Sequence, residues 1–156
     1  MTKEIERKFL VKGDFKNQAI KNHKIAQGYL STVPERTVRI RIRDNQGFLT
    51  IKGISNTSGT TRFEWEKEIR VNEAKNLLLL CEPTIIEKIR YIVPANNNLY
   101  FEVDVFIGEN IGLIIAEIEL PSENTEFTKP SWLGEEVTGQ LKYYNAMLAK
   151  KSFKDW

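Results

Sequence analysis

The feature that most constrains this chain is a period-two alternation of charged and apolar residues, which recurs in short segments along most of its length. Residues two apart in a β-strand share a face, so alternation of this kind indicates strands with one polar and one apolar face. Turn-forming residues such as Gly, Pro and Asn separate the segments. We therefore predict about eight antiparallel strands, near residues 3–11, 25–32, 37–44, 47–53, 60–71, 86–93, 98–107 and 113–120.

Helical patterns are fewer than strand patterns. Asn72 can cap a helix that runs from Glu73 to Glu82, and Pro83 would end it. A second helix is predicted from about Gly134, with an apolar stripe suited to packing on a sheet. This stripe consists of Val137, Leu141, Tyr144, Met147 and Leu148. A shorter helix is predicted after Asp14.

The length and composition are those of one globular domain. A chain of 156 residues is predicted to form a single domain, residues 1–156. The sequence is 41% hydrophobic and 28% charged, and no apolar run is long enough for a membrane span. Residues 1–6 mix charged and apolar residues where a secretory signal would be continuously apolar. We therefore expect a cytoplasmic protein.

Several chemistries are excluded by the residue inventory. Cys81 is the only cysteine and His23 the only histidine, which argues against disulfides, thiolate zinc sites and serine–histidine–aspartate catalysis. The formal net charge of +2 argues against a broadly basic nucleic-acid-binding protein. Any preference for an anion must therefore be local.

The polar faces of the predicted strands carry like charges. An exposed sheet face explains any one such strand, but neighbouring like charges repel each other unless a group of opposite sign lies between them. Seven segments have such charged faces, and nearly every one offers a pair of like charges, which suggests a charged ligand. The residues are Glu4, Glu6 and Lys8; Arg39, Arg41 and Arg43; Lys52; Glu64, Glu66 and Glu68; Lys88 and Arg90; Glu102 and Asp104; and Glu117 and Glu119.

A barrel of about eight strands has an interior wide enough only for side chains or one small ligand. If the apolar faces turn outward under the helices, the charged faces must point inward. Unpaired ions are costly to bury, so these groups must neutralise one another or bind a charged guest. A polyphosphate with divalent cations fits this requirement, because carboxylates bind Mg²⁺ or Mn²⁺ and basic side chains bind phosphate. Phosphoryl transfer needs the same combination.

A set of motifs occurs in a characteristic order along almost the whole chain. Glu4-Ile5-Glu6-Arg7-Lys8 has the form ExExK, and the C-terminal region contains Trp132-Leu133-Gly134-Glu135-Glu136-Val137-Thr138 and Tyr144-Asn145. With these motifs the chain resembles the CYTH family of triphosphate tunnel metalloenzymes. The intervening motifs are Gln27-Gly28-Tyr29-Leu30, Arg39-Ile40-Arg41, Leu49-Thr50-Ile51-Lys52, Glu64-Trp65-Glu66, Glu87-Lys88-Ile89-Arg90-Tyr91, Glu102-Val103-Asp104-Val105-Phe106 and Ala116-Glu117-Ile118-Glu119.

The resemblance implies a fold, a cofactor and a set of site residues. The fold is a mainly β, α+β architecture, a closed eight-stranded antiparallel barrel with a charged lumen and a few flanking helices. The implied cofactor is Mg²⁺ or Mn²⁺, held by Glu4, Glu6, Glu117 and Glu119, with Glu64, Glu66 and Asp104 for a second metal or its waters. The implied phosphate ligands are Lys8, Arg39, Arg41, Lys52, Lys88 and Arg90. Lys88 and Tyr29 resemble positions that tune catalysis and close the tunnel, although ordinary packing explains Tyr29 equally well.

Several activities share this scaffold. The short chain shows no obvious aromatic pocket for a base or thiazolium ring, which favours hydrolysis of inorganic triphosphate to pyrophosphate and orthophosphate. A class IV-type adenylate cyclase and a thiamine triphosphatase are the alternatives within the family. A non-catalytic polyphosphate or nucleotide sensor is the alternative of another class. We expect a small-molecule triphosphate as the partner, no membrane or nucleic acid, and a homodimer if the apolar outer face is left uncovered.

Overall fold

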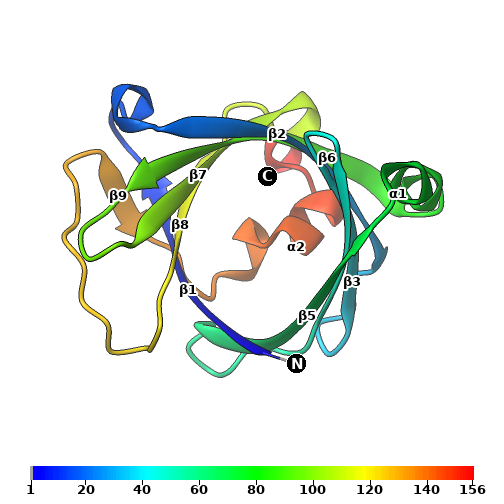
Figure 1. Ribbon diagram of the computed structural model, residues 1–156, viewed down its shortest axis with the longest axis horizontal. Coiled ribbons are helices and arrows are strands. Elements are labelled where there is room, and N and C mark those ends of the chain that lie inside the picture. Colours follow the sequence, from blue (N-terminus) through cyan, green and yellow to red (C-terminus); the bar gives the residue numbers. More distant parts are fainter. Residues whose placement is uncertain (1) are drawn as a thin grey trace.

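The computed structural model describes residues 2–156, which form a nine-stranded antiparallel sheet closed into a barrel (Figure 1). The described part of the chain contains two α-helices, α1 (Val71–Leu78) and α2 (Asn145–Lys150). Neither helix is long and apolar enough to cross a membrane. The strands are β1 (Thr2–Val11), β2 (Lys21–Ser31), β3 (Thr37–Arg43), β4 (Gln46–Lys52), β5 (Thr61–Ile69), β6 (Glu82–Pro94), β7 (Tyr100–Ile107), β8 (Ile114–Glu119) and β9 (Leu133–Glu136).

Eight of these strands form the closed ring. Their order is β5-β4-β3-β2-β6-β7-β8-β1, and the first half of β1 closes the ring by pairing with β5, with Lys3 opposite Phe63. The second half of β1 pairs with β9, where Phe9 lies opposite Glu136. The predicted eight-stranded antiparallel barrel is confirmed, and β9 is an additional strand.

The C-terminal helix predicted from Gly134 is wrong over its first half. Residues 133–136 form β9, and the Val137 amide donates to the Lys8 carbonyl at 2.8 Å, so this segment extends the sheet. Gly139 then adopts a φ of +79°, which a helix does not allow. Only residues 145–150 are α-helical, and Leu141, which was expected in the apolar stripe, is 60% exposed.

The other predicted helices are shorter than expected. Helix α1 starts at Val71, after the Arg70 amide that donates to Glu73 Oε1, and it ends at Leu78. Glu82 and Pro83 already belong to β6. The helix predicted after Asp14 is a single 3₁₀ turn over residues 16–18, whose first amide donates to Asp14 Oδ1.

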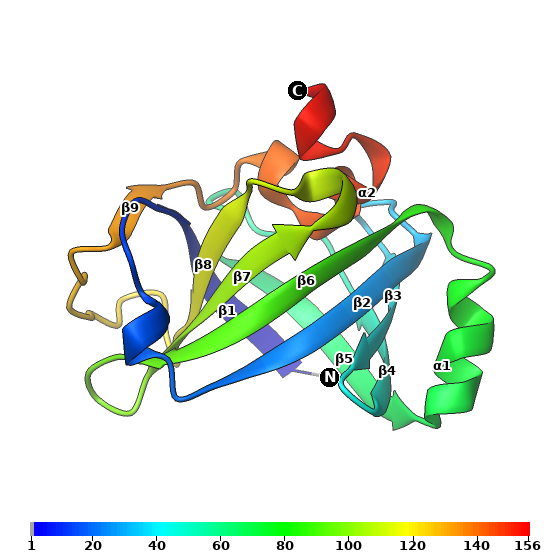
Figure 2. The same cartoon turned by 90° about the horizontal axis from the view of Figure 1, so that it is seen from above.

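The outer face of the barrel is covered mainly by irregular chain. An apolar cluster that includes Phe9, Phe101 and Ile118 packs against Phe15 and Trp132, which lie outside the regular strands. Helix α1 covers β3 and β4 on another side of the barrel (Figure 2). Helices therefore cover only part of the outer face. Three apolar side chains on β4 and β5 stay exposed, namely Ile51, Phe63 and Trp65.

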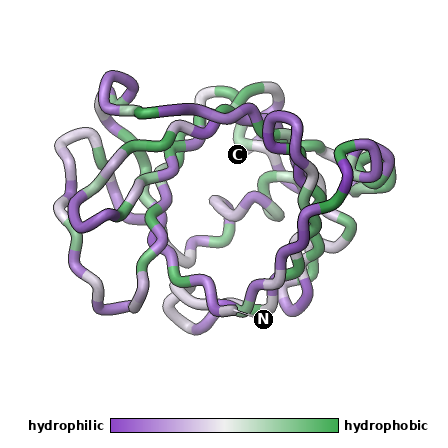
Figure 3. The backbone as a smooth tube through the Cα atoms, in the orientation of Figure 1, coloured by the Kyte–Doolittle hydropathy of each residue, from purple (hydrophilic) through white to green (hydrophobic). Residues whose placement is uncertain are grey.

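One end of the lumen is filled by the C-terminal segment. Helix α2 is seen inside the ring when the barrel is viewed along its axis (Figure 1), and it packs on β6 and β2. Leu148 and Ala149 belong to the same buried cluster as Ile86, Phe106 and Ile115. The backbone coloured by hydropathy shows polar and apolar residues interchanging along the strands (Figure 3). The lumen is thus apolar and sealed at the α2 end and charged beyond it.

Candidate active site

A cavity of about 640 Å³ occupies the charged part of the lumen. Tyr144 and Asn145 line it at the sealed end. Arg43, Glu102 and Glu119 also line a second hollow of about 540 Å³, which continues the cavity towards the opposite end. The barrel therefore offers a charged internal cavity with one end closed by the chain itself.

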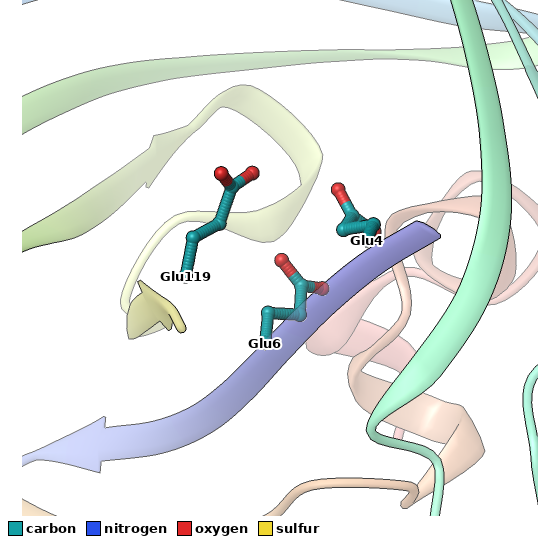
Figure 4. A group of neighbouring side chains, drawn as sticks. All are labelled: Glu4, Glu6 and Glu119. Atoms are coloured by element: carbon teal, nitrogen blue, oxygen red, sulfur yellow. The ribbon is translucent and has the colours of Figure 1, made fainter. Parts of the chain in front are cut away.

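The acidic wall of the cavity comes from β1 and β8. Glu6 lies directly opposite Glu119 in the strand pairing, and Lys8 lies opposite Glu117. One carboxylate oxygen from each of Glu4, Glu6 and Glu119 lies within 4.8 Å of the others, and the three side chains point towards one another (Figure 4). The ExExK spacing places the β1 residues on one face because they are two apart, and in the closed barrel this face lines the cavity. The structure thus brings three of the predicted metal ligands together.

The charges in this wall are only partly balanced. Burial, followed by Glu117 and Glu4, raises the pKa of Glu6 well above its usual range. Burial together with Glu102 and Glu4 raises the pKa of Glu119 to about 7. Hard divalent cations take clustered carboxylate oxygens, so the donor set fits Mg²⁺ or Mn²⁺ and a bound cation would relieve the repulsion.

Two acids of this region are compensated by the protein. Against the effect of burial, Lys52 holds the pKa of Glu4 well below its usual range, and its Nζ lies 2.9 Å from Glu4 Oε1. Burial also opposes ionisation of Glu117, but Lys8 and Arg90 hold its pKa low. Glu4 and Glu117 are therefore the acidic residues whose charges the basic wall compensates.

The basic wall is formed by β3, β4 and β6, with Lys8 from β1. All six predicted phosphate ligands are buried and line the cavity: Lys8, Arg39, Arg41, Lys52, Lys88 and Arg90. Burial, followed by the nearby Arg39 and Arg90, lowers the pKa of Arg41 to about 9. Within the described chain, the buried Nε of Arg39 has no hydrogen-bond partner. At Arg41 the neighbouring cations outweigh Glu102 and Asp104, so this part of the wall carries uncompensated positive charge, as an anion site requires.

Asp104 is placed differently from the other predicted metal ligands. It is completely buried, and its Oδ2 lies 2.7 Å from Lys88 Nζ. Arg90 forms a bidentate pair with the same carboxylate, at 2.8 and 2.9 Å. Both oxygens are therefore engaged by cations, and Asp104 is a counter-ion of the basic wall in this structure.

Glu64 and Glu66 lie on β5, which pairs with β1 on the other side from β8. Burial and the neighbouring Glu4 raise the pKa of Glu64 to about 7, so this side chain belongs to the same crowded acidic region. Glu66 Oε2 accepts from the Thr50 hydroxyl at 2.8 Å and lies 3.4 Å from an Arg39 nitrogen. Glu64 thus extends the acidic cluster, whereas Glu66 is partly occupied by Arg39.

Lys88 and Tyr29 lie at the sealed end of the cavity. Burial lowers the pKa of Lys88 to about 7, with Arg90 and Arg41 acting in the same direction and Asp104 against it. Lys88 Nζ donates to Asn145 Oδ1 at 3.0 Å. The Tyr29 hydroxyl accepts from Gln27 Nε2 at 3.2 Å. The two predicted catalytic residues are therefore close to the same uncharged amides.

Sequence reasoning missed these amides and two further cavity residues. Gln27 and Asn145 carry no charge and do not stand out in the charge pattern, although both fall within motifs of the family resemblance. Arg62 starts the inward face of β5 and lies 3.6 Å from Glu4. Tyr144 was predicted in the apolar stripe of the C-terminal helix, but it precedes α2 and lines the cavity. The matched C-terminal motif was the available signal for Tyr144 and Asn145.

Residues 2–153 match the family model of the CYTH domain, so the chain belongs to the CYTH domain family. It is 46% identical over 157 residues to the inorganic triphosphatase of Acetivibrio thermocellus, covering 100% of this chain and 99% of that protein. It is 37% identical over 150 residues to the inorganic triphosphatase of Nitrosomonas europaea, covering 94% and 96%. The crystal structure of the inorganic triphosphatase NE1496 superposes with a TM-score of 0.68 at 34% identity, covering 96% of this chain and 95% of that one.

Proposed function

We propose that this protein hydrolyses inorganic triphosphate (tripolyphosphate) to pyrophosphate and orthophosphate in its barrel, with Mg²⁺ or Mn²⁺. The observation that carries the proposal is the internal cavity between an under-compensated acidic wall and an under-compensated basic wall. A phosphate chain bound with a divalent cation neutralises both walls at once. Two full-length relatives named inorganic triphosphatase support the same activity.

The basic wall binds the phosphate chain in this proposal. Arginine and lysine form charge-assisted hydrogen bonds with phosphate oxygens, and these bonds are stronger than neutral ones. Arg39 Nε, which has no partner among residues 2–156, and the crowded guanidinium of Arg41 are the groups that gain most from an anion. The full set is Lys8, Arg39, Arg41, Lys52, Lys88 and Arg90.

The acidic wall holds the divalent cation. Glu4, Glu6 and Glu119 are the proposed ligands, with Glu117 and Glu64 beside them. A bound cation of this kind neutralises phosphate oxygens and lowers the pKa of coordinated water. The metal roles proposed for Glu66 and Asp104 are the weaker ones, because Arg39 and the Lys88–Arg90 pair engage their oxygens.

Lys88 and Tyr29 complete the chemistry of the sealed end. With a pKa of about 7, Lys88 is present in both forms near neutral pH: the ammonium form binds phosphate, and the unprotonated form can accept a proton from the attacking water. The Tyr29 hydroxyl accepts a hydrogen bond from Gln27, so its own proton remains available to donate into the cavity. Phosphoryl transfer depends mainly on such positioning and charge stabilisation.

The test is phosphate release from tripolyphosphate, ATP and thiamine triphosphate in parallel, with Mg²⁺, with Mn²⁺ and with EDTA, together with cyclic AMP production from ATP. The proposal expects metal-dependent cleavage of tripolyphosphate in preference to the other two compounds, and loss of that cleavage in Glu4→Ala and Glu117→Ala. Cyclic AMP as the main product would refute the triphosphatase proposal and indicate an adenylate cyclase. Tight tripolyphosphate binding without turnover would refute it and indicate a sensor.

A further inference from the structure

Two uncharged amides, Gln27 and Asn145, link the cations of the basic wall. Asn145 Oδ1 accepts from Lys88 Nζ at 3.0 Å and from Gln27 Nε2 at 3.3 Å. Gln27 Oε1 in turn accepts from Arg41 Nε at 3.3 Å. Gln27 is completely buried, so its hydrogen bonds are made to protein groups. The amides thus connect two phosphate-binding candidates on different strands.

The position of Lys88 is defined by two acceptors on opposite elements. Asp104 on β7 accepts from Lys88 Nζ at 2.7 Å, and Asn145, the first residue of α2, accepts at 3.0 Å. An ammonium group has three N–H donors, so one remains for a ligand. Asp104 is itself held by Arg90. Without Asn145 the Lys88 ammonium would be drawn towards the Asp104–Arg90 pair.

An amide has a specific advantage at this position. It accepts hydrogen bonds from Lys88 and Gln27 but does not neutralise the positive charge of the wall. A carboxylate of the same shape would make the same contacts and reduce the attraction for an anion, because buried charges interact strongly. The uncharged acceptor therefore orients Lys88 while leaving its charge for the ligand.

The C-terminal segment that carries Asn145 is anchored in the site by its neighbour. The ring of Tyr144 lies 4.7 Å from Lys8 Nζ and 5.6 Å from the Arg62 guanidinium carbon. Cation–π contacts of this kind hold an aromatic ring against basic side chains. Asn145 therefore projects from a segment that is itself seated on the cavity wall.

We propose that Asn145 is a positioning residue, whose hydrogen bond holds the Lys88 side chain in the position needed for catalysis. The C-terminal segment that carries Asn145 is then part of the active site. This role rests on the proposed triphosphatase function. Small displacements of a reacting group cost up to about 100-fold in rate. Loss of the Asn145 acceptor is therefore expected to affect turnover more than affinity.

The experiment compares Asn145→Ala and Asn145→Asp with the wild type. Asn145→Ala is expected to lower kcat for tripolyphosphate by about 10- to 100-fold, with tripolyphosphate affinity in EDTA within about 3-fold of wild type, since no charge changes. Asn145→Asp keeps the acceptor and adds a negative charge, so it is expected to weaken that affinity by about 10-fold. Lys150→Ala, an exposed residue at the end of α2, is the matched control and should match the wild type in both measurements.

Each outcome decides a different point. Wild-type kcat in Asn145→Ala, or equal affinities of the Ala and Asp variants, overturns the positioning role. If Asn145 had a purely structural role, both variants would have a lower melting temperature and the same changes in kcat and affinity. If the Ala variant does not fold, the isosteric Asp variant still tests the proposal. Absence of wild-type turnover refutes the triphosphatase function and the positioning role with it, whereas wild-type turnover with an unaffected Ala variant refutes the positioning role alone.

Discussion

Glu6 on β1 and Glu119 on β8 lie directly opposite each other in the barrel wall, and both carboxylates join Glu4 in one cluster. Like charges in opposite positions of a sheet destabilise it. Burial, and then the nearby Glu117 and Glu4, also raise the pKa of Glu6 well above its usual range. The barrel therefore carries a cluster that is unfavourable by itself and favourable with a cation.

Glu6→Gln should separate metal binding from folding. The variant removes one negative charge from the cluster, so in EDTA at pH 7 its melting temperature should be at least that of the wild type. Mg²⁺ or Mn²⁺ should raise the melting temperature of the wild type but not that of the variant. Metal-dependent turnover should fall at least about 100-fold. Glu68→Gln, on the exposed part of β5, is the control. A metal-induced shift in melting temperature that is the same in Glu6→Gln as in the wild type would contradict the assignment of Glu6 as a metal ligand.

The acidic wall should also make metal-free stability depend on pH. The pKa of Glu119 is about 7 in the folded protein and 4.5 in a model peptide, so the folded state binds this proton more tightly. The resulting stabilisation is fully present below pH 4.5 and is lost as the pH rises through 7. Thermal unfolding in EDTA between these values should show the wild type losing stability relative to Glu119→Gln. If the melting temperatures of the two proteins changed in parallel with pH, Glu119 would not contribute to the pH dependence of stability.

Arg41→Ala should weaken binding of tripolyphosphate measured by calorimetry in EDTA, where turnover is prevented. Loss of a charge-assisted hydrogen bond is worth about 1.5–3 kcal/mol, or roughly 10- to 100-fold in affinity. Arg36→Ala, an exposed arginine just before β3, removes the same charge outside the cavity and should change affinity little. Equal effects of the two substitutions would indicate general electrostatic attraction in place of a defined site.

Lys88 should define the pH dependence of turnover. Because burial lowers the pKa of Lys88 to about 7, kcat for tripolyphosphate should rise as the pH increases through this value. Lys88→Arg keeps the positive charge but cannot lose its proton near neutral pH, so the rise should disappear and kcat should fall about 100-fold or more. A variant that retains the same rising limb would show that another group titrates.

Gly59→Ala should disturb the packing of the C-terminal segment. Gly59 has a φ of +80°, and a Cβ there would lie 2.3 Å from the Cα of Gly139, which itself has a φ of +79°. Alanine at such a position costs more than about 1 kcal/mol from backbone strain alone. Denaturant unfolding should therefore show a clear loss of stability. Gly53→Ala, whose Cβ would meet Phe63 at an ordinary 3.8 Å, should be tolerated, and equal losses would contradict the steric argument.

Much of the barrel was predictable because the period-two pattern within a single segment shows which residues share a face of the strand. Glu4, Glu6 and Lys8 are each two residues apart, and this places them on one face of β1 whatever the partner strands are. The charge pattern does not reveal Gln27 and Asn145, which are neutral. It also does not distinguish Asp104 from the metal cluster, because the contact of Asp104 with Lys88 depends on the pairing of β6 with β7.

The sequence by itself determined the strand segments and which charged residues share a face of each strand. Only the tertiary structure decided the closure of β1 on β5, the ninth strand and the entry of the C-terminal segment into the lumen. These features depend on contacts between distant residues, such as Lys88 and Asn145, which are 57 positions apart. Periodicity reports which face a side chain is on, whereas the packing of remote segments decides what that face meets.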